Sequence, residues 1–89
     1  MTWQIKFSDR AAKHLESLDK TAQIRILKFL MNRVVPSGNP RLFGKALTGK
    51  LSGYWSCRVG DYRLVADFQD ENLIILVLNV GHRREVYED

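Results

Sequence analysis

The chain has 89 residues, 45% of them hydrophobic and 27% charged, which excludes a disordered protein and allows one thin-cored domain with no room for a second. The net charge is +4, but residues 1–63 carry twelve Lys and Arg against four Asp and Glu, whereas residues 64–89 carry two against six. The single cysteine, Cys57, excludes an intramolecular disulfide and favours a reducing, cytoplasmic location, and the polar and apolar alternation of residues 1–7 excludes a signal peptide or membrane span.

The first half of the chain predicts a strand followed by two helices. Residues 2–7 alternate, so one face of a short strand is apolar. Ser8 then serves as an N-cap, and apolar residues at helical spacing extend a helix to about residue 19. A second helix spans residues 21–35 and is closed by Pro36 with Ser37 and Gly38, because proline cannot continue a helix. Together the two helices form a hairpin.

The second half predicts strands. Residues 39–52 are basic and contain two glycines, and we read them as an exposed loop with possibly one short strand. Strands over 54–59 and 62–68 flank a Gly-Asp turn, and residues 73–80 are apolar on both faces, as in a central strand that Gly81 ends. The order β-α-α-β-β-β predicts an α+β fold in which the helices pack against a twisted, largely antiparallel sheet, as one domain over 1–89.

The tight hairpin predicts which side chains share a face. With Gly60 and Asp61 as the two loop residues, Arg58 lies directly opposite Arg63, and period-two alternation places Ser56 on the same face while the other face is apolar. Two arginines opposite one another are destabilising unless an anion lies between them. The pair therefore indicates either a phosphate site or, with equal weight, two guanidiniums that turn to water or pair with a carboxylate such as Asp67.

More cations follow the central strand. His82, Arg83 and Arg84 come directly after it, and if that strand pairs with residues 62–68, Arg83 approaches Arg58 and Arg63. Tyr87 lies four residues further along. The alternatives are a solvated charge run for the arginines and a terminal aromatic packed on the core for Tyr87. With one cysteine and two distant histidines the sequence has no metal-ligand spacing, so we expect neither a metal site nor a cofactor.

Two segments carry a family resemblance. The run KALTGKLSGYWSCRVGDYRLV over residues 45–65 and the ending NVGHRREVY over residues 79–87 resemble the RelE branch of the RelE/ParE superfamily of bacterial toxins. The resemblance spans nearly the whole chain. Its RVGDYR hairpin is shared across the superfamily, whereas its GHRxEVY ending is more specific to the ribonuclease branch.

The resemblance implies ribosome-dependent cleavage of mRNA in the A site by a toxin of a type II toxin–antitoxin system. It places Arg63 and Arg83 at phosphate-stabilising positions, Tyr87 at a catalytic tyrosine, and Arg58 at a basic position of the active-site strand. Ser56 stands where relatives often have a second basic residue. The implied partners are a cognate antitoxin, the ribosome and mRNA, with operator DNA bound only through the antitoxin complex and no membrane. The predicted RNA- and ribosome-binding residues are Arg41, Lys45, Lys50, His82 and Arg84.

The residue types suit metal-independent RNA cleavage. A 2′-hydroxyl attacks the adjacent phosphate, and guanidiniums stabilise the extra negative charge of the transition state. Arginine stays protonated and is a poor base. Tyr87, with an ordinary phenol pKa of about 10, acts as the base only if cations lower that value, and otherwise donates a hydrogen bond. Two other functions stay open: a ParE-like gyrase poison without nuclease activity, and an antitoxin-bound co-repressor module.

Overall fold

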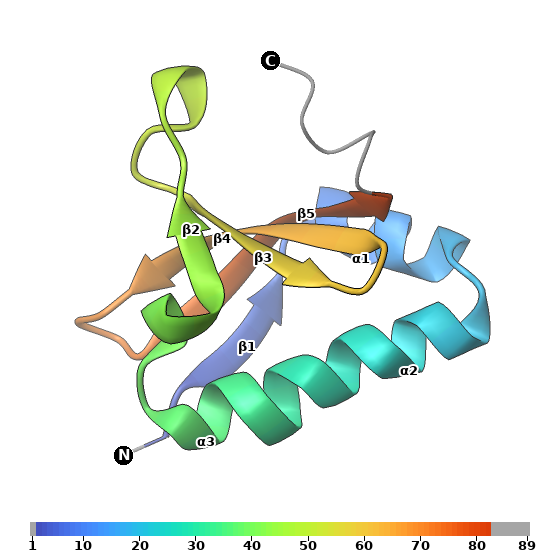
Figure 1. Cartoon of the computed structure of the whole chain (residues 1–89), viewed down its shortest axis with the longest axis horizontal. Helices are drawn as coiled ribbons and strands as arrows, with labels where there is room; N and C mark the ends of the chain where they lie inside the picture. The colour runs from blue at the N-terminus through green and yellow to red at the C-terminus, as the bar shows by residue number, and fades with distance from the viewer. Residues whose placement is uncertain (1, 83–89) are drawn as a thin grey trace.

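The computed structural model describes residues 2–82, which form a five-stranded sheet with a long helix across one face (Figure 1). The strand order is β1-β5-β4-β3-β2, and the sheet is mixed, because β1 runs parallel to β5 while the other neighbours are antiparallel. The α+β class is as predicted, and the predicted order β-α-α-β-β-β is observed with one further strand, β2. The principal elements are β1 (Gln4–Phe7), α1 (Asp9–Ser17), α2 (Lys20–Phe29), β2 (Gly44–Ala46), β3 (Trp55–Val59), β4 (Tyr62–Gln69) and β5 (Ile74–His82).

The corner between β1 and α1 is fixed by Ser8. Its Oγ accepts a hydrogen bond from the Ala11 backbone N–H at 3.1 Å, which confirms the predicted N-cap. The same hydroxyl donates to the Leu78 carbonyl at 3.1 Å. Leu78 is the extra residue of a bulge in β5, because the register steps from Val65 opposite Asn79 to Ala66 opposite Val77. One hydroxyl thus caps α1 and joins it to the sheet.

The second helix is longer than predicted and changes register near its end. After α2 it continues through a π-helical turn (Leu30–Val34) into α3 (Val35–Ser37). The helix ends within the predicted Pro36-Ser37-Gly38 stop, at Gly38 with φ +72°, but Pro36 itself lies inside the last turn and does not end it. Val35 donates its N–H to Leu30, five residues back. Pro36 follows this change of register and has no N–H that needs a partner.

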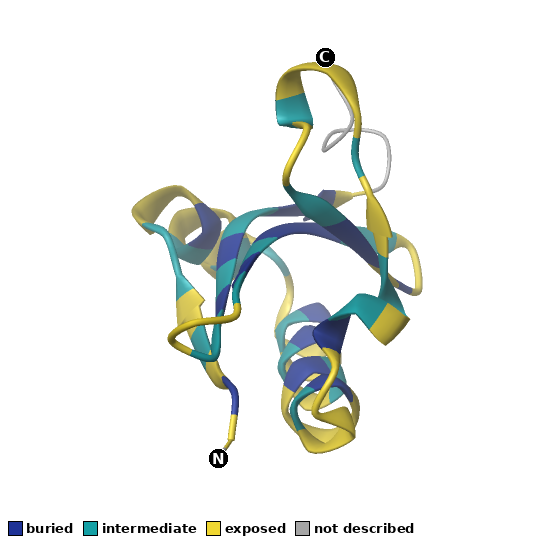
Figure 2. Ribbon diagram, turned by 90° about the vertical axis from the view of Figure 1, so that its left-hand side faces the viewer, coloured by how far each residue is buried: buried dark blue, intermediate teal, exposed yellow. Residues whose placement is uncertain are grey.

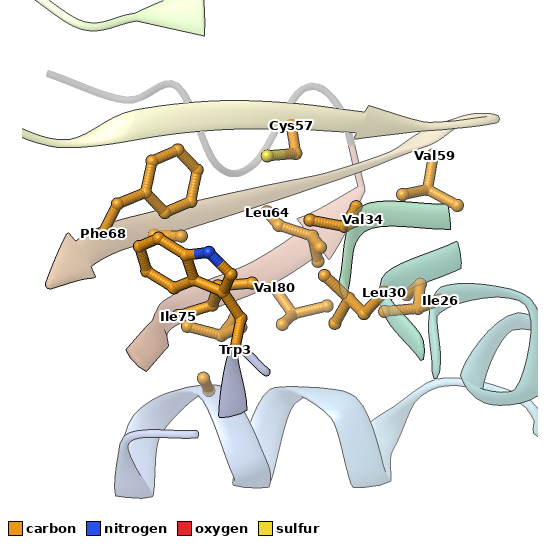
Figure 3. Packing of buried hydrophobic residues seen from close by; sticks show 13 residues of the cluster. Trp3, Ile26, Leu30, Val34, Cys57, Val59, Leu64, Phe68, Ile75 and Val80 are labelled. Atoms are coloured by element: carbon orange, nitrogen blue, oxygen red, sulfur yellow. The ribbon is translucent and has the colours of Figure 1, made fainter. Parts of the chain in front are cut away.

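The core lies between α2 and the sheet. Ile26, Leu30 and Val34 on the helix point toward Leu64 and other sheet residues (Figure 3). Burial is concentrated along this contact (Figure 2). Cys57 is part of the cluster, and its removal from water raises the pKa of the thiol to about 11. Within residues 2–82 no helix is long and apolar enough to cross a membrane.

The strands differ from prediction in one respect. Residues 39–52, predicted as a loop with possibly one short strand, contain the strand β2, preceded by a 3-10 turn (Pro40–Phe43) and followed by another (Gly49–Leu51). However, β5 does not end at Gly81. It runs to His82, because Gly81 pairs with Arg63 and His82 pairs with Tyr62. The pairing of β5 with β4 therefore extends to Tyr62, the first residue of β4. The sheet thus carries β5 to the turn end of the β3–β4 hairpin, because Tyr62 directly follows the turn.

Candidate functional site

The β3–β4 hairpin has the predicted register. Val59 lies opposite Tyr62 and Arg58 opposite Arg63, with Gly60 in the turn at φ +59°, a conformation that favours glycine. Cys57, Val59 and Leu64 belong to the core cluster that packs against α2. Alternation then places Arg58 and Arg63 on the opposite face, away from α2.

That opposite face gathers three cations. Lys45 of β2 pairs with Ser56 of β3, so Lys45 shares the face of Ser56, Arg58 and Arg63. We call these four residues the arginine face. Lys45 and Arg58 are exposed, Arg63 is half-buried with its Nε shielded from solvent, and Ser56 is buried. Within residues 2–82 no carboxylate forms an ion pair with Arg58, and Asp67 instead accepts a hydrogen bond from Gln69 at 3.3 Å.

Lys50 stands on an arm beside the arginine face. After β2 the chain rises on the side of the sheet away from α2, forms the 3-10 turn Gly49–Leu51 and returns into β3 (Figures 1 and 2). Leu47 donates its N–H to the Tyr54 carbonyl at 3.0 Å and so closes the base of the arm. The arm places Lys50, which is exposed, on the same side of the sheet as Arg58.

His82 does not join the arginines. It pairs with Tyr62, whose side chain lies on the face opposite Arg63, and the two rings meet edge to face with their centroids 5.9 Å apart. Its predicted contact with RNA stays a prediction, but it would be made from the other face of the sheet.

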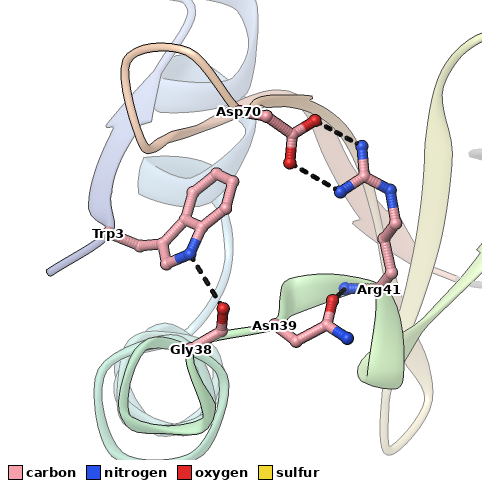
Figure 4. Close-up of polar contacts among 5 residues, drawn as sticks. All are labelled: Trp3, Gly38, Asn39, Arg41 and Asp70. Atoms are coloured by element: carbon pink, nitrogen blue, oxygen red, sulfur yellow. Dashed lines mark hydrogen bonds and ion pairs between the residues drawn. The ribbon is translucent and has the colours of Figure 1, made fainter. Parts of the chain in front are cut away.

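Arg41 is also directed away from the arginine face. Its guanidinium donates two hydrogen bonds to Asp70, at 2.8 and 2.7 Å (Figure 4). It also lies over the rings of Trp55 and Phe68, at 5.5 and 5.6 Å from their centroids. These contacts tie the turn before β2 to the end of β4. Arg41 therefore positions β2, and with it Lys45, whereas its predicted contact with RNA remains untested.

Comparison with known proteins identifies the family. Residues 5–87 match the sequence model of a protein family described as the ParE toxin of type II toxin-antitoxin system, parDE. The chain belongs to this toxin family. Toxin RelG of Mycobacterium tuberculosis is 30% identical over 87 residues, covering 98% of both chains, and Toxin RelE of the same organism is 26% identical over 85 residues, covering 96% of this chain and 86% of the relative.

Solved structures agree with that assignment. The toxin–antitoxin complex RelBE2 from Mycobacterium tuberculosis matches with a TM-score of 0.84 and 28% identity, over 93% of this chain and 100% of the other. The isolated Escherichia coli RelE toxin matches with a TM-score of 0.72 and 28% identity, over 96% and 90%. Within the RelE/ParE superfamily the protein is thus a RelE-type toxin, as the GHRREVY ending indicated.

Three predicted residues of this toxin, Arg83, Arg84 and Tyr87, lie outside the described residues. The structure fixes the position from which they start, because β5 ends one residue past the Gly81–Arg63 pair. Between residues 2 and 82, no three His, Cys, Asp or Glu side chains gather as metal ligands.

No sequence pattern indicates the position of Lys45. A strand of three residues, Gly44–Ala46, is too short to show alternation, and its pairing depends on contacts with residues far along the chain. Lys45 was predicted as a ribosome contact, but not as the neighbour of Ser56.

The Arg41–Asp70 pair predicts a pH-dependent contribution to the stability of this toxin. The hydrogen bonds and charge of Arg41 lower the pKa of Asp70 below its ordinary value, and the same contact raises the pKa of Arg41. The contribution is therefore present above the ordinary Asp pKa of about 3.9 and is lost as the pH falls through the lower folded value. Asp70→Asn should melt slightly below wild type at neutral pH.

Thermal unfolding across a pH series checks this expectation, and the two melting curves should converge in acid. Asp67→Asn is the control, because Asp67 has no ion pair within the described part of the chain. A difference between wild type and Asp70→Asn that stays constant down to strongly acidic pH would contradict the electrostatic origin.

Proposed function

We propose that this RelE-type toxin is an endoribonuclease that cleaves mRNA in the A site of the ribosome. The observation that carries the proposal is Arg58 directly opposite Arg63, with Lys45 on the same face. Like charges placed opposite each other in a sheet are unfavourable. An anion bound between them removes that repulsion, and an RNA phosphate is the anion that this toxin family's chemistry supplies.

In the proposed reaction the 2′-hydroxyl oxygen attacks the adjacent phosphorus. The new bond to the 2′-oxygen forms as the bond to the 5′-oxygen breaks, leaving a cyclic phosphate and a new 5′-hydroxyl. The 2′-hydroxyl proton passes to a base, and a proton is delivered to the leaving 5′-oxygen. Arg63 and Arg83 stabilise the charge that develops on the phosphoryl oxygens, and Tyr87 acts at a transferring proton, as base or as hydrogen-bond donor.

Lys45 has a place in this proposal. Ser56 occupies a strand position at which relatives often carry a basic side chain, and Lys45 lies directly across the ladder from it. Opposed residues of neighbouring strands have their Cβ atoms within about 5.5 Å. Lys45 therefore supplies a cation beside Ser56 that a serine cannot supply itself.

The proposed partners follow from the relatives. The RelBE2 proteins of Mycobacterium tuberculosis were solved as a toxin–antitoxin complex, and so were RelB and RelE of Pyrococcus horikoshii. We propose that this toxin likewise binds a cognate antitoxin in the cytoplasm and reaches operator DNA only through it. The cationic excess of residues 1–63 favours an acidic antitoxin segment.

The test is cleavage by purified protein with and without ribosomes. We expect mRNA to be cut within A-site codons on programmed ribosomes and to be left intact without them. A matched DNA strand should resist, because it lacks the 2′-hydroxyl. Intact mRNA on ribosomes in the presence of correctly folded toxin would contradict the proposal.

The matched family is described by its ParE toxin, which supports a second candidate function: a gyrase poison without nuclease activity. Growth arrest accompanied by gyrase-linked DNA breaks, with mRNA left whole, would favour it. Pulse labelling of protein and DNA synthesis after induction separates the two, because mRNA cleavage stops translation first.

A further inference from the structure

A cationic hollow lies between α2 and the end of β3. The β3–β4 hairpin comes over α2 at this point (Figure 1). The hollow encloses about 410 Å³, and four cations line it: Arg25, Lys28, Arg33 and Arg58. No carboxylate is among its lining residues within the described part of the chain. We call this hollow the α2 trough. Four like charges around one open hollow repel each other unless a polyanion occupies it.

The π turn helps to align these cations. Eight residues separate Arg25 from Arg33, and in a regular α-helix they advance about 80° beyond two full turns. A π turn accommodates one extra residue, and one residue corresponds to about 100°. The turn Leu30–Val34 contains Arg33 and offsets part of that advance, and Arg25 and Arg33 both line the trough. Lys28 lies one turn from Arg25, so the charges follow one another along the helix.

Two of the side chains lie close to other parts of the chain. Arg33 lies over the Phe43 ring, with its guanidinium carbon 5.8 Å from the ring centroid. The Nη1 of Arg25 lies so close to Gly60 that a Cβ added there would be only 3.0 Å from it. The contact with Phe43 restricts the Arg33 side chain, so less conformational entropy is lost when Arg33 binds an anion.

Arg58 connects the trough with the arginine face. It follows the last β3 residue that pairs with β2, so at this open edge of the sheet a residue on the face away from α2 also borders the trough. It is also the residue opposite Arg63. A chain of phosphates lying along α2 can therefore pass over the end of β3 to the Arg58–Arg63 pair and stay in contact with cationic side chains throughout. An acidic peptide would satisfy the trough alone, but this continuity with the proposed cleavage site favours RNA.

We infer that the α2 trough binds the phosphodiester backbone of single-stranded RNA and holds it beside the arginine face. The identity of the ligand rests on the proposed function. Arg25, Lys28 and Arg33 are contacts for affinity, and none of them touches the reacting phosphate. Their loss should weaken binding and its salt dependence while leaving the cleavage step intact.

The test uses two full-length triple variants with the same change of charge. In the trough variant Arg25, Lys28 and Arg33 become Gln, and Arg58 is left in place. In the control variant Lys6, Arg10 and Lys13 become Gln, since these exposed cations lie on β1 and α1 and do not line the trough. Both variants must melt as wild type does. Binding of a fluorescent oligouridine, and of ribosomes, is then measured against salt.

Three lost phosphate contacts should reduce the slope of log affinity against log salt by about 2 for a single strand. We expect the trough variant to bind oligouridine on the order of 10-fold or more weakly at low salt, and the control much less so. On saturating ribosomes the single-turnover cleavage rate of the trough variant should equal that of wild type. Equal affinities and slopes for the two variants would overturn the inference, as would unchanged RNA binding combined with lost antitoxin binding.

The outcomes separate this inference from the proposed function. If wild type cuts no mRNA on ribosomes, the proposed function fails, yet a loss of oligouridine binding confined to the trough variant still supports the trough. If wild type cuts and the trough variant binds RNA as the control does, the trough inference alone fails.

Discussion

Replacing Arg63 with Ala is expected to slow mRNA cleavage by about 100-fold or more, because one preorganised donor to a developing oxyanion contributes on that order. Arg83→Ala should have an effect of the same size. The measurement is the single-turnover rate on saturating ribosomes, which separates the chemical step from ribosome binding. Arg63→Lys should also be slow, since lysine keeps the charge but loses the planar fork that contacts two phosphate oxygens.

Folding is the control for this prediction. Arg63 is half-buried and its Nε is shielded, so its alanine variant must be compared with wild type by thermal unfolding. Arg58→Ala is the matched change on the opposite strand, and it should leave the melting temperature unchanged or slightly raised, because it relieves the contact between like charges. Arg10→Ala, on α1, should alter neither activity nor stability. An Arg63→Ala protein that unfolds while Arg63→Lys cuts normally would assign Arg63 a structural role.

The hairpin could be predicted in detail from the sequence, and the reason is local. A two-residue Gly-Asp loop fixes the register of both strands, and side-chain alternation then sorts every residue onto a face. The opposition of Arg58 and Arg63 follows from these two rules alone. The N-cap at Ser8 was equally accessible, because its signal lies within one turn of helix.

Other features depend on contacts that no local pattern records. The sequence marks Pro36 as a helix end, but the π turn before it is set by packing of Leu30 and Val34 against the sheet. Gly81 was read as a strand end, yet the neighbouring strand pairs with it. The Ser8 hydroxyl reaches Leu78 across seventy residues of chain, and it could not be foreseen without the bulge in β5.

The candidate site likewise contains residues that could be predicted from local patterns and residues that could not. Arg58 and Arg63 were predicted together, whereas Arg25, Lys28 and Arg33 were not singled out, because three cations on a helix are most often solvated. Only the approach of β3 to α2 shows that they face Arg58 across a hollow. Conversely, His82 and Arg41 looked like members of one basic surface, but strand alternation and the pair with Asp70 direct both away from it.

Tyr87→Phe is expected to produce a marked defect in single-turnover cleavage with ribosome affinity largely kept. The change removes one hydroxyl and keeps the ring, so a tyrosine that only packs on the core should tolerate it. A hydroxyl that transfers or donates a proton in the transition state contributes about 100-fold or more to the rate. Ribosome binding depends on phosphate contacts to cations, none of which this substitution removes.

The pH dependence of the residual rate distinguishes the two roles of Tyr87. If the phenol is the base, the wild-type rate should rise with pH through a pKa lowered by the neighbouring cations, and the Phe variant should lose that rise. If it donates a hydrogen bond, both proteins should keep the same profile and differ only in rate. Tyr62→Phe is the matched control, because Tyr62 lies on the face opposite Arg63. Normal cutting by Tyr87→Phe, with Tyr62→Phe equally active, would remove Tyr87 from the catalytic set and leave the chemistry to the arginine face.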